Sequence, residues 1–162
     1  MDSNEAGERA LLRHTVATLA YRGGKAVRGA PPEFASLRAG ATTRTPVDIL
    51  AHVGDLLDWA GSLVRGQQRW NTSTPLAWDD EVNRFFGALQ ALDAQLAADE
   101  PLACSAEKLF QGPIADALTH VGQITMLRRL GGAPVKGENY FKADIVAGRV
   151  GAGQTAPKME FD

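Results

Sequence analysis

Two histidines, His52 and His120, are the residues whose type and placement point most directly to metal chemistry. Each lies in a segment with helical periodicity, and Asp116 precedes His120 by four residues. Residues spaced i and i+4 share one face of a helix, so Asp116 and His120 can point to the same spot. If the helix that carries His52 packs beside this face, two imidazoles and one carboxylate converge.

Three such ligands leave coordination positions open for water or substrate, which suits Zn²⁺ or Ni²⁺ used as a Lewis acid. Mn²⁺ and Fe²⁺ accept the same ligands, and the set is similar to the facial triad of non-haem Fe(II) oxygenases. That triad is usually displayed on a β-barrel, so helical segments argue against oxygenase chemistry. We therefore expect a divalent transition metal, with Zn²⁺ or Ni²⁺ ahead of Mn²⁺ or Fe²⁺.

A metal-free explanation of the same residues stays open. The face of His52 mixes His, Asp and Trp with leucines and looks inward-facing and polar, and a core histidine there can be hydrogen-bonded to a neighbouring carboxylate or carbonyl. On this segment alone the core role is favoured. The Asp116–His120 pair shifts the balance towards metal, because bundle cores draw metal ligands from facing helices.

Two polar residues share helix faces with the histidines and are candidates for a catalytic or orienting role. Asp55 follows His52 by three residues, and Gln123 follows His120 by three. Either side chain could orient a metal ligand through a hydrogen bond, as the outer partners of metal sites do.

Three further residues are candidates for lining a substrate site. Trp59 shares the face of His52 at i+7, while Asn139 and Tyr140 belong to a loop-like segment that could fold over the mouth of a bundle. By contrast, His14 is interpreted as a packing or surface histidine. Cys104 has no histidine close in sequence and is a poor candidate nucleophile.

Apolar residues recur at spacings of three and four, which predicts amphipathic helices. Thr45-Pro46 and Thr74-Pro75 are typical helix starts, with threonine as N-cap and proline in the first turn. Gly112-Pro113 is expected to break the last helical region. The predicted helices cover about residues 4–28, 45–66, 75–99, a short segment from 105, and 113–130.

These elements predict an all-α fold, a four-helix bundle, in a single domain of residues 1–162. The connection of about 16 residues between the first two helices is long enough for a crossover, so simple up-down order is not required. Residues 137–162 are expected to form an irregular tail on the bundle, with a helical turn or two near its start and a Gly-rich stretch that is extended or mobile.

Composition narrows the classes of function. The net charge of −2 and pI of about 5.9 provide no basic surface for nucleic acid. One cysteine allows no intrachain disulfide, which fits a reducing compartment. The sequence contains no transmembrane-length apolar run, signal-type segment, phosphate-binding glycine loop after a strand, or serine nucleophile elbow. We expect a cytoplasmic protein that binds neither nucleic acid nor membrane.

Two stretches, residues 45–56 and residues 116–128, resemble the DinB-like proteins of the DinB/YfiT superfamily. The second contains His120-Val-Gly-Gln123-Ile124 and is similar to the family signature H-x-x-x-H-x-G-Q-I. The resemblance covers nearly the whole chain. It implies a bundle with an up-down-down-up course and a crossover connection, often assembled as a homodimer.

The resemblance also implies a divalent metal held by three histidines. By position, His52 matches the first ligand and His120 the third, while Asp116 stands where the family usually has the middle histidine. Aspartate can still bind the metal, or it can mark a site that has lost it. Members of the family act as thiol-dependent S-transferases or isomerases that use low-molecular-weight thiols, or as metal-dependent hydrolases.

The sequence thus predicts a metal-dependent enzyme acting on a small molecule, of thiol-dependent S-transferase or hydrolase type, with a low-molecular-weight thiol as one candidate cosubstrate. The alternative is a metal-free, dimeric helical bundle that acts as a binding or stress-response module.

Overall fold

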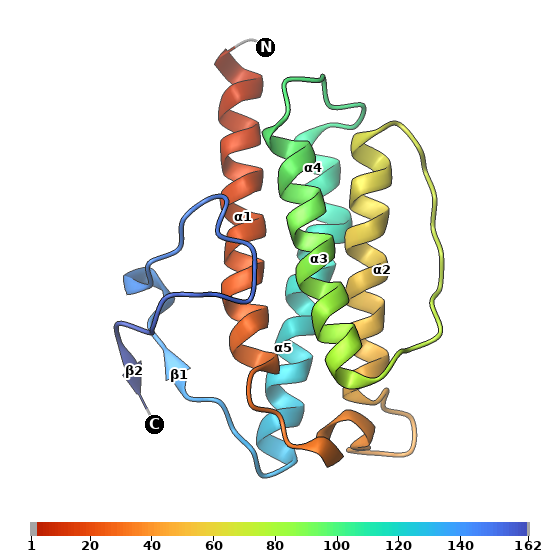
Figure 1. Cartoon of the computed structure of the whole chain (residues 1–162), viewed down its shortest axis with the longest axis vertical. Helices are drawn as coiled ribbons and strands as arrows, with labels where there is room; N and C mark the ends of the chain where they lie inside the picture. Colours follow the sequence, from red (N-terminus) through yellow and green to blue (C-terminus); the bar gives the residue numbers. More distant parts are fainter. Residues whose placement is uncertain (1–2, 162) are drawn as a thin grey trace.

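The computed structural model describes residues 3–161 and is mostly helical, with four long helices and a small two-stranded sheet (Figure 1). The long helices are α1 (Ser3–Val27), α2 (Pro46–Val64), α3 (Trp78–Ala97) and α5 (Ala115–Leu130). The shorter elements are η1 (Pro32–Ser36), α4 (Ala106–Leu109), η2 (Phe110–Ile114), β1 (Gly137–Glu138), η3 (Tyr140–Lys142) and β2 (Glu160–Phe161). The expected helical bundle is therefore present.

The long helices stand at the corners of a square. Helices α1 and α2 each pack against both α3 and α5, so α1 and α2 are diagonally opposite. The segment 65–77 runs back along the bundle beside α2, and α3 consequently runs parallel to α2 (Figure 1). The crossover connection, which runs the length of the bundle, thus joins α2 to α3. The segment between α1 and α2, which the sequence showed to be long enough for a crossover, stays at one end of the bundle.

The start of α2 is confirmed in detail. Thr45 caps the helix, Pro46 occupies its first turn, and a reciprocal capping box links Thr45 to Asp48. The Asp48 carboxylate accepts hydrogen bonds from the backbone N–H of Thr45 at 3.1 Å and from its hydroxyl at 2.6 Å. Both hydrogen bonds lower the pKa of Asp48, and the bond from the Thr45 hydroxyl has the larger effect. The first turn is therefore fixed by local chemistry that the sequence displays.

The predicted start of α3 at Thr74-Pro75 is wrong. Helix α3 begins at Trp78, and its N-cap, Ala77, provides no side-chain hydrogen bond. Glu81, a buried residue of the first turn, instead accepts a hydrogen bond from the backbone N–H of Leu76 at 2.9 Å. Because Glu81, inside the helix, caps the N-terminus of α3, Thr74 and Pro75 remain part of the extended connection.

The interruption predicted at Gly112-Pro113 is present, with a short helix before it and a long one after it, but it is a π-helical turn and not a break. Helices α4 and α5 are joined by η2, one π-helical turn that contains Pro113. Proline lacks an N–H and usually breaks a helix, but a wider turn can absorb it without ending the helical path.

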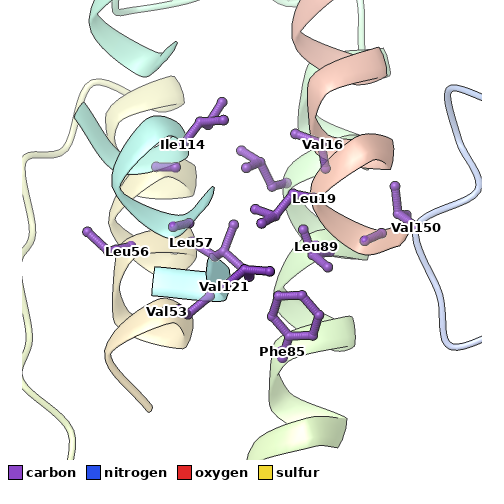
Figure 2. Close-up of a cluster of buried hydrophobic side chains, with 14 of the residues drawn as sticks. Val16, Leu19, Val53, Leu56, Leu57, Phe85, Leu89, Ile114, Val121 and Val150 are labelled. Atoms are coloured by element: carbon purple, nitrogen blue, oxygen red, sulfur yellow. The ribbon is translucent and has the colours of Figure 1, made fainter. Parts of the chain in front are cut away.

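The core lies among the four long helices (Figure 2). Leu57 of α2, Phe85 and Leu89 of α3, and Ile114 beside α5 are each at most 1% exposed. Val150 of the tail is buried with them, so the Gly-rich part of the tail packs on the bundle.

The rest of the tail is fastened to α1. The Tyr21 hydroxyl donates to the Glu138 carboxylate at 2.6 Å, and Lys25 donates to Glu138 and to Glu160 at 2.8 and 2.7 Å. Glu138 and Glu160 are also paired in the antiparallel β1–β2 ladder. The expected helical turn is present only as η3, after β1.

Gly23 marks a close approach of α1 to α3, because a Cβ at this position would lie 2.5 Å from Cζ of the buried Phe85. Gly23→Ala should lower the free energy of unfolding by about 1–3 kcal/mol through overpacking. Gly87→Ala, where a Cβ meets nothing within 4 Å, should raise it by about 0.5–1 kcal/mol. Urea unfolding of both variants measures the difference, and equal stabilisation by both would contradict the close approach.

Candidate metal centre

The packing of α2 against α5 brings His52, Asp116 and His120 together. One potential ligand atom of each residue lies within 4.8 Å of the other two. Nε2 of His52 is 3.7 Å from one Asp116 carboxylate oxygen, and Nδ1 of His120 is 3.2 Å from the other. The imidazole rings meet edge to face with centroids 4.7 Å apart. The structure thus assembles the three residues that the sequence selected.

The protonation of the His120 ring follows from its contacts. Nδ1 lies 2.8 Å from the backbone carbonyl oxygen of Asp116, one turn earlier in α5. A carbonyl oxygen can only accept, so Nδ1 carries the hydrogen and Nε2 keeps its lone pair in the neutral ring. Metal-binding histidines are commonly held in this way by a carbonyl on the second nitrogen.

His52 is held in the neutral form. Burial comes first among the causes that lower its pKa, followed by electrostatic interaction with His120 and Arg44, while the charges of Asp116 and Asp55 act in the opposite sense. Its ordinary pKa of about 6.5 is thereby reduced further. At neutral pH the imidazole is available as a ligand, since only the deprotonated form binds metal.

A cleft of about 650 Å³ opens beside the two histidines. This volume is in the range of small-molecule sites. Besides His52 and His120, its lining consists of Ala39, Thr43, Arg44, Ile49, Gln123, Met126, Leu127 and Leu130. Gln123, selected from the sequence, therefore lines the cleft, and a molecule bound there would reach both imidazoles.

The π-helical turn η2 immediately precedes this site. Asp116 is the second residue of α5, directly after the turn. Within η2, a Cβ on Gly112 would lie 3.8 Å from the Trp59 ring of α2, so this turn packs closely on that tryptophan. Such insertions are frequent at functional sites, because one extra residue changes which face the following helix presents.

Asp55 has a different environment from the histidines. Its carboxylate accepts from the backbone N–H and hydroxyl of Ser73 at 3.0 and 2.5 Å, and from Arg84 at 2.6 Å. Burial would raise the pKa of Asp55, but the hydrogen bonds from Ser73 and Arg84 outweigh it and lower that pKa. Asp55 fastens the segment 65–77 to α2 and α3, and it is not part of the three-residue cluster.

Trp59 is linked to His52 by a second tryptophan, Trp70, which contacts both rings. Trp70, in the segment 65–77, meets the Trp59 ring at 5.8 Å and the His52 ring at 5.7 Å, edge to face in both cases. Trp70 is not a candidate from the sequence, because an isolated tryptophan in a polar connection gives no indication of the helix it will contact.

Asn139 and Tyr140 lie on the other side of the bundle from the expected position. The Tyr140 ring packs 6.2 Å from the Tyr21 ring and beneath the Arg22 guanidinium, both on α1. Asn139 accepts from the backbone N–H of Phe141 at the start of η3. Neither residue lines the cleft that contains the histidines.

Comparisons with known proteins add no assignment: no protein-family model, curated protein or solved structure matches this chain. Within residues 3–161, every helix is too short or too polar to cross a membrane.

The Asp55 cluster predicts a specific dependence of stability on pH. A carboxyl with a lowered folded-state pKa stabilises the protein above its unfolded pKa of about 3.9, and that contribution is lost as the pH falls through the folded pKa. Asp55→Asn should therefore show a shallower loss of stability below about pH 4. Urea unfolding across this range measures it. Asp58→Asn, which alters a 60% exposed partner of Arg84, should resemble the wild type, and identical profiles for all three proteins would contradict the role of Asp55.

Proposed function

We propose that this protein is a metal-dependent enzyme that acts on a small molecule, with a divalent cation held by His52, Asp116 and His120. The observation that carries the proposal is the convergence of these three ligands from α2 and α5 within 4.8 Å of one another, beside a ligand-sized cleft.

The residues present fit such a cation. Ligands at about 2.0–2.2 Å from one ion stand roughly 3–3.5 Å apart, and Nε2 of His52 lies 3.7 Å from one Asp116 carboxylate oxygen. The hydrogen on Nδ1 of His120 is directed to a backbone carbonyl, which leaves Nε2 as the donor. Two imidazoles and one carboxylate favour Zn²⁺ or Ni²⁺, with Mn²⁺ or Fe²⁺ as alternatives.

The chain's own residues would divide the remaining work. A divalent cation supplies Lewis acidity towards a substrate oxygen or sulfur. Gln123, exposed on the cleft wall, offers an amide that can both donate and accept hydrogen bonds to orient a substrate. Trp70 covers one side of the His52 ring. The apolar cleft residues would exclude water from the non-reacting part of the substrate.

The reaction class comes from the resemblance to DinB-like proteins, supported by the course of the chain. Helices α2 and α3 run parallel, joined by a connection that spans the bundle (Figure 1), as the up-down-down-up arrangement requires. We therefore favour thiol-dependent S-transfer or hydrolysis. A homodimeric assembly and a cytoplasmic location belong to the same proposal.

A metal-free binding module is the second candidate. Asp116 already contacts both histidines, at 3.7 and 3.2 Å, so the three residues satisfy one another in part without an ion. In that case the cluster would be a polar network that fixes α2 against α5, and Asp116 would mark a site that has lost its metal.

Metal content tests the proposal directly. Protein purified without a histidine tag should bind about one equivalent of Zn²⁺ or Ni²⁺ by elemental analysis, and His52→Ala and His120→Ala should each lose it, because two ligands rarely retain an ion. His14→Ala is the matched control, since His14 lies exposed on α1. Stoichiometric metal in His52→Ala, or none in the reconstituted wild type, would refute the three-ligand site.

Thermal unfolding with and without a chelator separates the two candidates. A ligand at 100 times its Kd stabilises the folded state by about 2.7 kcal/mol, which corresponds to roughly 5–10 °C in Tm for a domain of this size. EDTA should lower the Tm of the Zn²⁺-loaded wild type by about this amount and leave Asp116→Ala unchanged. Equal Tm values for the wild type with and without EDTA would favour the metal-free module.

A further inference from the structure

Arg44 is the only lysine, arginine, aspartate or glutamate among the described residues that line the cleft beside His52 and His120. It enters the wall from the segment just before α2. The carboxylate of the site, Asp116, is not among the residues that line the cleft. The lining therefore carries one permanent charge, and that charge is positive.

The Arg44 guanidinium makes no hydrogen bond or ion pair with any side chain or carbonyl in residues 3–161. Asp48 feels the charge of Arg44, but its Oδ2 accepts hydrogen bonds from Thr45 and it forms no ion pair with Arg44. Arg84 and Arg128, in contrast, are occupied in binding carboxylates or helix-end carbonyls. Arg44 therefore has its donors free to bind a ligand.

The backbone of Arg44 is fixed although its side chain is exposed. It directly precedes Thr45, the N-cap held by the capping box, and His52 lies two turns further along the same helix. One rigid element thus positions both the cationic wall residue and a metal ligand. A molecule that spans the cleft can contact both.

The rest of the wall is largely apolar. Ile49 and Leu127 are buried, whereas Met126 and Leu130 are 57% and 63% exposed on the face of α5 that borders the cleft. An apolar surface next to a free guanidinium is suited to a molecule with a carbon chain and one anionic group, since arginine binds carboxylate and phosphate oxygens through paired N–H donors.

We propose that Arg44 selects small organic anions as substrates, with its guanidinium on a carboxylate or phosphate group and the carbon chain along Met126 and Leu130. This inference rests on the proposed function, because it assigns the reacting end of the molecule to the His52–Asp116–His120 site. It deepens that function by naming a substrate class and a residue that determines specificity.

The test is an NMR titration of the metal-free protein at pH 8 in EDTA with three six-carbon probes: hexanoate, hexyl phosphate and neutral hexanamide. The wild type should bind the better anion about fivefold more tightly than hexanamide, the upper end for an exposed ion pair. Arg44→Gln should abolish this preference without changing hexanamide binding, and Arg44→Lys should retain part of it. The stronger of the two anions identifies the head group.

Arg129→Gln is the matched control, because Arg129 is exposed on α5 and does not line the cleft. It should keep the wild-type preference. Equal binding of hexanamide and both anions to the wild type, absence of binding by all three, or a preference that survives in Arg44→Gln would each overturn the inference.

Failure of the inference can be told apart from failure of the metal site. The titration contains no metal, whereas the metal site is judged by elemental analysis of His52→Ala and His120→Ala. If the protein binds no metal but still prefers anions in a way that depends on Arg44, the anion site is supported and the metal-dependent enzyme is refuted.

Discussion

The packing of α2 against α5 is the interaction on which the candidate site depends. Val53 and Leu57 of α2 lie among Ile114 and Val121 on the other side of this contact (Figure 2). Burial of these side chains sets the rotation of both helices about their axes. His52 and His120 flank the apolar seam where it reaches the surface, so their convergence follows from burial that has no chemical role itself.

A second constraint comes from the segment 65–77. This connection has no regular secondary structure, yet Asp55 and Arg84 hold it at Ser73. Gly54 allows the arrangement, because a Cβ there would lie 2.9 Å from the Arg84 guanidinium carbon. The clamp keeps the connection along α2, which places Trp70 on His52. An ion cluster that includes none of the three candidate ligands thus supports the position of Trp70 beside His52.

The net charge of a metal-loaded site would depend on whether residue 116 is an aspartate or a histidine. With Asp116 among the ligands, a divalent cation would leave a net charge of about +1 at the cluster, whereas three histidines would leave +2. Arg44 adds a positive charge to the wall of the same cleft. With a metal bound, the aspartate would moderate the positive field, and the arginine would supply attraction for an anionic substrate.

The sequence by itself determined what is local. The Thr45-Pro46 start, the positions of the long helices, and the shared face of Asp116 and His120 depend on residues within a few turns, so their patterns are visible in the chain. Selecting His52 as their partner required an expectation about helix packing, which the resemblance to DinB-like proteins reinforced.

Only the tertiary structure decided the contacts between distant segments. Asp55 meets Arg84 29 residues away, and Tyr140 packs on α1 instead of the cleft. Pro113 sits in a π-helical turn where a helix break was expected, and Arg44 lines the cleft. Each outcome depends on which helix faces pack together. That packing is set by the apolar area buried over the whole chain, which no short stretch of sequence specifies.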